Sequence, residues 1–323
     1  MSAFFDAVRS FFEHLAAVDF RALAVASTFQ ILRLIVRTRA WRNIIAAAYP
    51  GKRVHWRAVL GSYLAGVGLN AITPARAGDV VKLFLVKRRV EGSTYPTLAA
   101  TLVVETLFDF VVAGAIFVWA LQLGVFPSLD RLPRLPSIEW SWPLSHPRVL
   151  EIAVPVLVGA IVLALVWATR RVRAFWRRVA QGFRILRDPA LYLQRVVAWQ
   201  ALSWVFRLAA IYWFLRAFNL PSSIHDSLLV QSAQSLATIV PITPGGAGTE
   251  QGLLLYLFRG KAARTEVLSF SVGMHITIVV VNVVLGAVAL ALLTRSLRLG
   301  RLRSDAAADS HTTAVQGTQS EPR

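Results

Sequence analysis

Two carboxylates lie inside one of the most apolar stretches of the chain. Glu105 and Asp109 are four residues apart in the segment LVVETLFDFVVAGAIF, a spacing that puts both on one face of a helix. In hydrocarbon each would cost roughly 3 kcal/mol unless it were paired or hydrated. Ion pairs with Arg33, Arg37 or Arg207 would give the two carboxylates a structural role. Without such pairs they are candidates for carrying protons, because burial and a like-charged neighbour favour the protonated form.

The chain also resembles itself at an offset of 170 residues. Ile72–Asp79 (ITPARAGD) aligns with Ile242–Thr249 (ITPGGAGT), with five of the eight positions identical, and the same offset pairs Arg37 with Arg207. Three predicted crossings separate the copies, and an odd number should invert the second copy relative to the first. Chance similarity between two turns of biased composition is the alternative.

Proline interrupts an apolar segment in each copy, at Pro74 and Pro244. Proline and glycine free polar backbone groups, which survive in a membrane only beside protein or a wet cavity. In transporters the half-helix after such a break points its positive end at an anionic group. We therefore predict an anion-binding centre, with packing kinks as the alternative. Its predicted residues are Arg76, Gly78, Gly245, Gly246 and Gly248, where the half-helices restart, with Arg37 and Arg207 lining the route.

Asp79 and Glu250 each follow the last glycine of a break. We group them with Glu105 and Asp109 as candidates for proton coupling or charge pairing. His275 falls opposite Glu105 in the repeat, and we interpret it as a hydrogen-bonded interior histidine rather than a proton carrier. The chain has no cysteine, which excludes disulfides and thiolate metal sites, and we expect neither a metal nor a cofactor.

Long apolar helices must position these residues. With 56% hydrophobic and 16% charged residues, the chain is more apolar than an ordinary soluble protein, and several runs approach the roughly 20 residues that cross a bilayer. The predicted spans are Phe20–Ala47, Thr97–Phe126, Val149–Thr169, Leu191–Phe218 and Glu266–Thr294, and the broken segments are His55–Val90 and His225–Gly260. The sequence thus predicts an all-α, polytopic transmembrane helix bundle with two inverted repeats, each containing a Pro/Gly-broken re-entrant hairpin.

This pattern divides the chain into three parts. Residues 1–19 are expected to form an interfacial segment, and residues 20–303 a transmembrane domain. Within that domain, repeat 1 covers about 20–126, repeat 2 about 191–294, and a linking span with a basic loop covers 149–187. Residues 304–323 are polar and small, with too little apolar area to offset chain entropy, and predict a disordered tail.

The net charge of +18 is concentrated at the ends of apolar runs rather than along one solvated face, which favours a membrane over nucleic acid as the partner. If each broken segment enters and leaves on one side, the loops at 49–57, 82–89, 170–187 and 295–303 share a side and hold 18 Lys and Arg, against seven opposite. The positive-inside rule then places these loops and the C-terminal tail in the cytoplasm. We expect a multi-pass protein of the plasma membrane. Phe175 and Trp176 in the most basic loop indicate a stretch that lies on anionic lipid.

Three motifs are recognisable: NAITPARAGDVVK at 70–82, ETLFD at 105–109 and PITPGGAGTEQ at 241–251. Together they resemble the lysylphosphatidylglycerol synthase transmembrane, or flippase-like, family, over about Phe20 to Thr294. The resemblance implies a polytopic domain that moves lipids or lipid-linked headgroups between leaflets. The chain departs from the family in two places. Met1–Asp19 is too short and charged for the further helix that usually comes first, and Thr106 stands where arginine is frequent.

In the full-length synthase, the resemblance further implies, such a domain flips aminoacylated phosphatidylglycerol made by an attached catalytic domain. This chain ends at Arg323, so we expect any lipid-synthesising enzyme to be a separate protein. The expected partners are membrane lipids, either an anionic phospholipid or a polyprenyl-phosphate-linked lipid, and no nucleic acid.

The predicted function is therefore a flippase or transporter for an anionic lipid headgroup. No phosphate-binding loop of the ATPase kind is present, so movement is expected to run downhill or to be coupled to protons. An intramembrane lipid-modifying transferase is one alternative, since His14 and Asp19 have the spacing of an acyltransferase pair. A carrier for small anionic solutes is another. No other catalytic motif is found, and we expect the protein not to be an enzyme.

Overall fold

The structure is a computed structural model that describes residues 18–73, 77–122, 169–239 and 248–318. Those residues form helices and no strand, which confirms the predicted all-α class. The α-helices are α2 (Phe20–Ala48), α3 (Trp56–Ile72), α4 (Ala77–Lys87), α5 (Tyr95–Gln122), α8 (Thr169–Gly182), α9 (Pro189–Tyr192), α10 (Ala198–Ala217), α11 (Ile224–Ile239), α12 (Thr249–Leu257) and α13 (Arg264–Thr318). A 3-10 turn, η3 (Arg184–Arg187), precedes α9, and a π-helical turn, η4 (Leu193–Val197), follows it.

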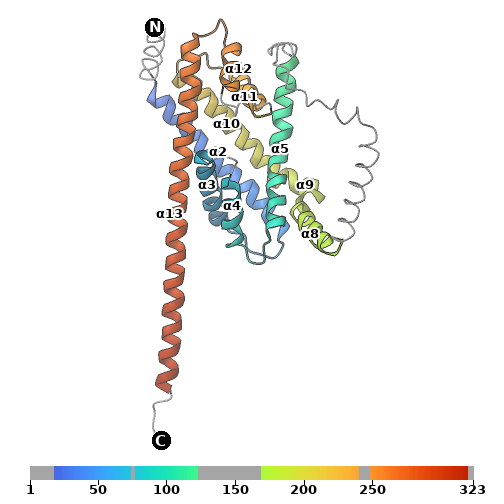
Figure 1. Cartoon of the computed structure of the whole chain (residues 1–323), viewed down its shortest axis with the longest axis vertical. Helices are drawn as coiled ribbons and strands as arrows, with labels where there is room; N and C mark the ends of the chain where they lie inside the picture. The colour runs from blue at the N-terminus through green and yellow to red at the C-terminus, as the bar shows by residue number, and fades with distance from the viewer. Residues whose placement is uncertain (1–17, 74–76, 123–168, 240–247, 319–323) are drawn as a thin grey trace, which may run out of the picture.

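The centre of the bundle is the antiparallel pair α2 and α10 (Figure 1). At one end of the pair, the backbone N–H of Asp19 donates to the carbonyl of Ala217, at 2.9 Å. At the other end, the side-chain amide of Asn43 donates to the carbonyl of Arg195, at 2.7 Å. Small buried side chains where the two helices cross, such as Ala26, let the backbones approach closely.

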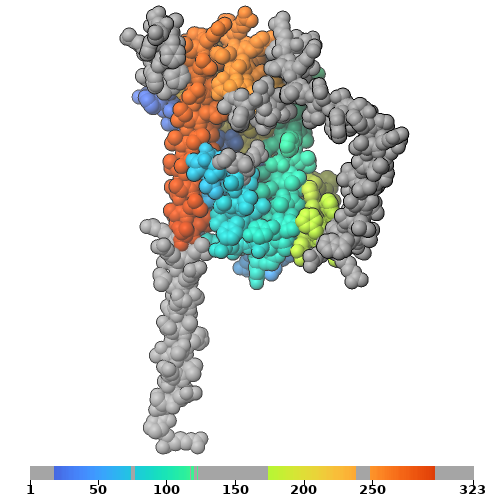
Figure 2. Space-filling model, in the orientation of Figure 1, coloured from blue at the N-terminus to red at the C-terminus, as the bar shows by residue number. Residues whose placement is uncertain are grey.

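Glycines let α3 pack closely on both α4 and α13. A Cβ on Gly78 of α4 would lie 2.0 Å from the carbonyl oxygen of Gly66 in α3, and one on Gly68 would lie 2.7 Å from Cα of Gly286 in α13. Neither position has room for a methyl group, because backbone lies directly opposite. On the face shown in Figure 2, the α3 and α4 region accordingly lies between α13 and α5.

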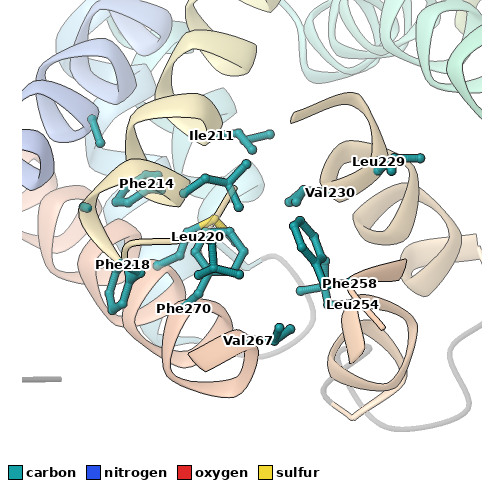
Figure 3. Close-up of a cluster of buried hydrophobic side chains, with 14 of the residues drawn as sticks. Ile211, Phe214, Phe218, Leu220, Leu229, Val230, Leu254, Phe258, Val267 and Phe270 are labelled. Atoms are coloured by element: carbon teal, nitrogen blue, oxygen red, sulfur yellow. The ribbon is translucent and has the colours of Figure 1, made fainter. Parts of the chain in front are cut away.

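The other pair of short helices, α11 and α12, packs against α10 and α13 through a large apolar cluster (Figure 3). Phe214 of α10, Leu254 of α12 and Phe270 of α13 are each at most 1% exposed in it. A second cluster, centred on Trp41, Tyr63 and Leu98, joins α2 to α3, α4 and α5. Each pair of short helices is thus fixed to its neighbours by a core of its own.

Three described stretches are long and apolar enough to cross a membrane: Tyr95–Ile116, Pro189–Ala217 and Arg264–Thr294. Large apolar side chains on their outer faces are exposed, among them Phe110 at 72% and Val280 at 53%, as expected where lipid covers the protein. α2 is as long as these helices and carries several arginines, but its contacts with α3, α5 and α10 place it inside the bundle.

Most predicted elements have a counterpart in the fold. The spans predicted at Phe20–Ala47, Thr97–Phe126, Leu191–Phe218 and Glu266–Thr294 correspond to α2, α5, the run from α9 to α10, and the first part of α13. The broken segments correspond to α3 with α4 and to α11 with α12. The predicted span Val149–Thr169 lies outside the described residues except for Thr169, as do residues 1–17 of the predicted interfacial segment.

The C-terminal segment differs from the prediction. α13 continues to Thr318, so helix replaces the predicted disorder from residue 304 to that point. Extending an existing helix is far easier than nucleating one, and the alanines at 306–308 favour extension. Composition alone predicted disorder because it ignores the long helix that comes before.

Candidate functional site

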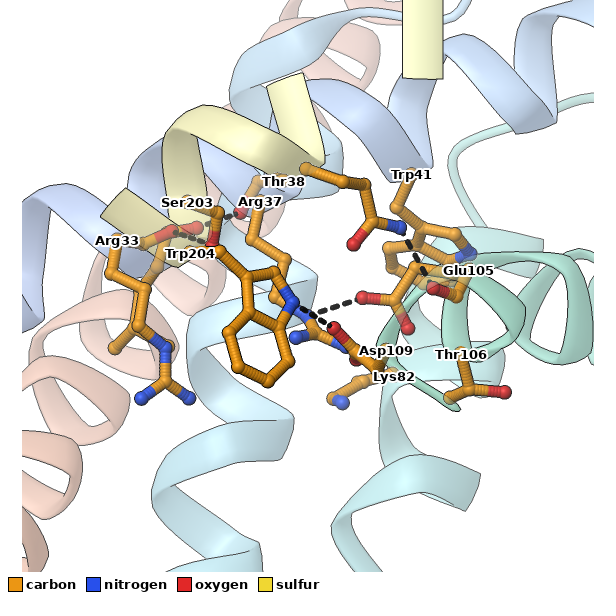
Figure 4. Close-up of polar contacts among 12 residues, drawn as sticks. Arg33, Arg37, Thr38, Trp41, Lys82, Glu105, Thr106, Asp109, Ser203 and Trp204 are labelled. Carbon is orange, nitrogen blue, oxygen red and sulfur yellow. Dashed lines mark hydrogen bonds and ion pairs between the residues drawn. The ribbon is translucent and has the colours of Figure 1, made fainter. Parts of the chain in front are cut away.

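Arg37 of α2 forms ion pairs with both carboxylates of α5 (Figure 4). Its Nε donates to Oε1 of Glu105, and its Nη2 donates to Oδ2 of Asp109. The three side chains are 12%, 4% and 23% exposed, respectively. Of the three arginines considered as partners from sequence, Arg37 is the one that pairs with them. The arrangement favours the structural interpretation of Glu105 and Asp109.

Residues of α10 hold this ion-paired trio from the opposite side. The indole Nε1 of Trp204 donates to Oδ1 of Asp109 at 2.9 Å, and the side-chain amide of Gln200 donates to the backbone carbonyl of Glu105 at 2.7 Å. Trp204 is 7% exposed and Gln200 is fully buried. Hydrogen bonds in this low-dielectric setting fix α5 against α10, and Trp204 orients the carboxylate of Asp109.

Arg33 and Arg207 differ from Arg37, since neither forms an ion pair with a carboxylate of the described residues. Nη1 of Arg33 donates to Oε1 of Gln30 at 3.2 Å, and Nη2 of Arg207 donates to Oε1 of Gln234 at 3.5 Å. The Arg207 guanidinium also lies 5.1 Å from the ring centroid of Trp204, and its buried Nε has no hydrogen-bond partner among the described residues. Two guanidinium groups with neutral partners keep donors available for an anion.

All these arginines lie near the middle of their helices. Arg33 and Arg37 are more than ten residues from either end of α2, and Arg207 is nine residues after the start of α10. At 1.5 Å per residue this places them about 14 Å or more from the nearer helix end. The α2 and α10 backbones touch at the same level, where the Ser203 hydroxyl donates to the carbonyl of Arg33 at 3.4 Å (Figure 4).

Glu250 lies in the first turn of α12 and joins this polar layer through Gln234. The amide of Gln234 donates to Oε1 of Glu250 at 3.3 Å, so one glutamine contacts both Glu250 and Arg207. Oε2 of Glu250 lies 3.5 Å from Nε2 of His275. The start of a helix carries partial positive charge, which also favours the carboxylate there. His275 therefore contacts a carboxylate of α12, and its Nδ1 lies 3.2 Å from the carbonyl of Ser271.

A third polar group links α3 and α4. Asp79, in the first turn of α4, lies 2.8 Å from Nζ of Lys82 and accepts a hydrogen bond from the amide of Asn70 at 3.0 Å. Nζ of Lys82 also lies 4.4 Å from the ring centroid of Tyr63. Lys82 is only 7% exposed, and its partners make Asp79 part of the α3–α4 contact.

The two described glycines of the predicted breaks, Gly78 and Gly248, lie at or next to the start of a helix. α4 begins at Ala77, one residue before Gly78. α12 begins at Thr249, and Gly248 before it has a φ of 90°, a conformation that favours glycine. The remaining predicted break and anion-binding residues lie outside the described part of the chain, namely Pro74, Arg76, Pro244, Gly245 and Gly246.

Two residues singled out from sequence have local structural roles. The carboxylate of Asp19 accepts the backbone N–H groups of Arg21 and Ala22 and caps α2. Thr106, where relatives often carry arginine, donates its hydroxyl to the carbonyl of Val103 in its own helix. Its side chain therefore adds no charge to the Arg37 group, which consists of Arg37, Glu105 and Asp109.

The sequence did not identify Trp204, Gln200, Gln234 or Lys82 as site residues, and it treated Arg33 only as a pairing partner. Lys82 had a local signal, since it lies three residues after Asp79 and can pair along one helix face. The other three contact residues at least 16 positions away, which no local pattern reveals. No group of metal-binding side chains is found among the residues that the structure describes.

Two kinds of known protein resemble this chain. A family model described as the lysylphosphatidylglycerol synthase TM region matches residues 3–286. A UPF0104 membrane protein from Methanocaldococcus jannaschii is 22% identical over 195 residues, which cover 60% of this chain and 80% of that protein. No solved structure matches. The family and the three bilayer-length helices indicate an integral membrane protein. The chain belongs to the family of the lysylphosphatidylglycerol synthase transmembrane region.

Proposed function

We propose that this protein moves the headgroup of an anionic phospholipid or polyprenyl-phosphate-linked lipid between the leaflets of the plasma membrane. The observation that carries the proposal is the pair Arg33 and Arg207. Both lie at the middle of long helices, and neither has a carboxylate partner among the described residues. A cation at that depth is costly unless something compensates it. A passing phosphate group would supply the compensation.

We further propose that the two halves are inverted repeats. Three features support this proposal. α2 and α10 are antiparallel, and Ser203 contacts Arg33, its counterpart at the offset of 170 residues. α3 follows the end of α2 and α11 follows the end of α10, so the two pairs of short helices start from opposite ends of the central pair. Finally, α13 packs on α3 while α5 packs on α11, which is a reciprocal exchange of partners.

In this scheme α3 with α4 and α11 with α12 are re-entrant hairpins that enter from opposite sides. The helix starts at Ala77 and Thr249 would then approach the arginine layer from the two sides of the membrane. The headgroup would pass along this polar layer while its acyl chains stay in lipid, which avoids roughly 0.8 kcal/mol for each methylene exposed to water.

Most of the basic stretches predicted as loops are helical, in α4, in α8 with η3 and in α13, and their charge sets the proposed orientation. The positive-inside rule puts residues 49–57, 82–89, 170–187 and 295–303 in the cytoplasm. Proton coupling, if present, is best assigned to Glu250, which lies next to a histidine and a glutamine. Glu105 and Asp109 are held by Arg37 and are assigned a positioning role instead.

The test is a reconstitution. Purified protein in liposomes should expose fluorescent phosphatidylglycerol of the inner leaflet to an external quencher faster than protein-free liposomes do. The same liposomes loaded with fluorescent phosphatidylcholine provide the comparison of headgroup charge. Unchanged quenching of phosphatidylglycerol, measured beside a working flippase, would reject the proposal.

One alternative shares the same chemistry. A carrier for small soluble anions would also use Arg33 and Arg207, and uptake of radiolabelled phosphate or glycerol phosphate by these liposomes without movement of lipid would favour it. A lipid-modifying transferase gains no support from the described residues, because Asp19 of its proposed pair caps α2.

A further inference from the structure

A second basic site lies at the end of α2, ten or more residues along the chain from Arg37. It is a pocket of about 720 Å³ between that helix end and the segment from α8 to α9. Its polar lining includes Arg177, Arg184 and Arg187, none of which forms an ion pair with a carboxylate of the described residues. Asp188 also lines the pocket, but its Oδ1 accepts the N–H of Leu191 and caps α9. The three guanidinium groups therefore exceed the negative charge around them.

Local helix geometry brings these arginines together. Arg177 and Gln181 are one turn apart on α8 and share a face, and Arg184 begins η3 two residues after α8 ends. Arg184 and Arg187 are the first and last residues of η3. In a 3-10 helix, residues three apart lie directly above one another. Two consecutive helical segments, α8 and η3, thus bring the arginines of the pocket together.

The scaffold behind the arginines is fixed by the core. Ile185 of η3 is 2% exposed and packs in a buried cluster with Ile44 of α2 and Val196. The amide of Gln181 donates to the carbonyl of Ala48 at 2.8 Å, at the end of α2. A Cβ on Gly182 would lie 2.6 Å from the carbonyl oxygen of Thr97 in α5, so α8 is held against α5.

The depth of the pocket matches that of lipid headgroups. Asp188 and Leu191, which line it, lie at the start of the candidate span Pro189–Ala217. On the neighbouring α8, Phe175 and Trp176 are 48% and 61% exposed. Aromatic side chains prefer the membrane–water boundary, and basic pockets at that level bind lipid phosphates.

We infer that this pocket binds the phosphate of an anionic phospholipid from the leaflet on the basic side of the protein. The site is separate from Arg33 and Arg207 and does not depend on lipid movement. A lipid bound there would be held by the pocket arginines through charge-assisted hydrogen bonds. Its acyl chains would run into the bilayer alongside the span that begins at Pro189.

The experiment measures the thermal unfolding midpoint of the full-length protein in a zwitterionic detergent-lipid mixture. Phosphatidylglycerol should raise the midpoint, because a ligand that binds only the folded state stabilises it. Phosphatidylcholine and glycerol phosphate should leave it unchanged. A rise with phosphatidylcholine as large as that with phosphatidylglycerol would overturn the inference, as would an equal rise with glycerol phosphate, which would indicate a site for free phosphate.

Variants then locate the effect. In the variant Arg184→Gln/Arg187→Gln, the phosphatidylglycerol concentration that gives half of the rise in the unfolding midpoint should increase roughly tenfold. Arg178→Gln, on the same helix but outside the pocket lining, is the matched control and should keep the wild-type value. Each variant is compared with its own lipid-free midpoint. Arg177→Gln leaves η3 intact and serves as the second pocket variant. An unaltered half-shift concentration in both pocket variants would overturn the inference.

Discussion

Two groups of arginine in the same polar layer differ in the charge of their partners. Arg37 is held by two carboxylates of α5. Trp204 bonds the Asp109 carboxylate, and Gln200 bonds the backbone carbonyl of Glu105. Arg33 and Arg207, by contrast, form their described hydrogen bonds with the neutral side chains of Gln30 and Gln234. The sequence suggested similar roles for Arg37 and Arg207 because they are counterparts in the repeat.

The difference separates a role in holding the fold together from a role in binding an anion. A buried charge whose partner is removed destabilises a fold strongly, whereas a buried charge that has no partner costs stability as it stands. Arg37 should therefore matter chiefly for folding. Arg33 and Arg207 should matter chiefly for binding an anion, since a fold gains nothing from uncompensated cations at that depth.

The largest expected effect follows from breaking the ion-paired trio. Arg37→Gln would leave Glu105 and Asp109 without their cation, and we expect a loss of roughly 3 to 5 kcal/mol in the free energy of unfolding. Denaturation of the purified protein in detergent measures it. Arg21→Gln, an exposed position on the same helix, is the control. A loss below about 1 kcal/mol would show that the trio does not hold the bundle together.

A smaller effect is expected at the residue that contacts both groups. Trp204→Phe keeps an aromatic ring beside Arg207 and removes the N–H group that donates a hydrogen bond to Asp109. Hydrogen bonds to charged groups contribute about 1.5 to 3 kcal/mol, so we expect a loss of roughly 2 kcal/mol. The same denaturation experiment checks this value. Wild-type stability in this variant would mean that the two groups are not coupled through Trp204.

Whether a feature of the fold or of the site could be predicted from the sequence depends on how far apart in the chain the interacting residues lie. α2, α5, α10 and the first part of α13 coincide with apolar runs, and Gly248 directly precedes a helix start, so local patterns predicted these elements. The i, i+4 spacing of Glu105 and Asp109 also predicted that both carboxylates lie on one helix face, where arginine could pair with them.

What the sequence could not supply was the choice among partners. Three arginines were compatible with the α5 carboxylates, and only the packing of α2 against α5 selects Arg37. Trp204 reaches Asp109 across 95 positions, and Gln234 bridges Arg207 and Glu250 between different helices. Such contacts are set by the crossing of helices and leave no periodic signal in the chain.

The contribution of Gln234 can be tested through transport. Gln234→Leu would remove the described hydrogen bonds to Arg207 and Glu250 while keeping a similar volume. Arg207 would then be less well positioned, and we expect phosphatidylglycerol movement in liposomes to slow about threefold, which corresponds to roughly 0.7 kcal/mol. Gln194→Leu, an exposed position that precedes α10, is the matched substitution. Unchanged movement would assign Gln234 to packing alone.

The smallest effect is expected at His275. Its side chain is 50% exposed, and exposed pairs contribute little, so His275→Gln should change the free energy of unfolding by at most about 0.5 kcal/mol. A much larger loss would mean that the Glu250 contact is as important to the fold as the Arg37 group.

The proposal that Arg33 and Arg207 bind the phosphate of a lipid is best tested with the variant Arg33→Gln/Arg207→Gln. We predict that this variant unfolds at or above the wild-type midpoint, because two partly buried cations without a carboxylate partner are removed. In liposomes its movement of phosphatidylglycerol should fall at least roughly tenfold, about 1.4 kcal/mol in the barrier. Arg216→Gln, exposed at the end of α10, should move lipid normally. Wild-type lipid movement by the well-folded double variant would contradict the account.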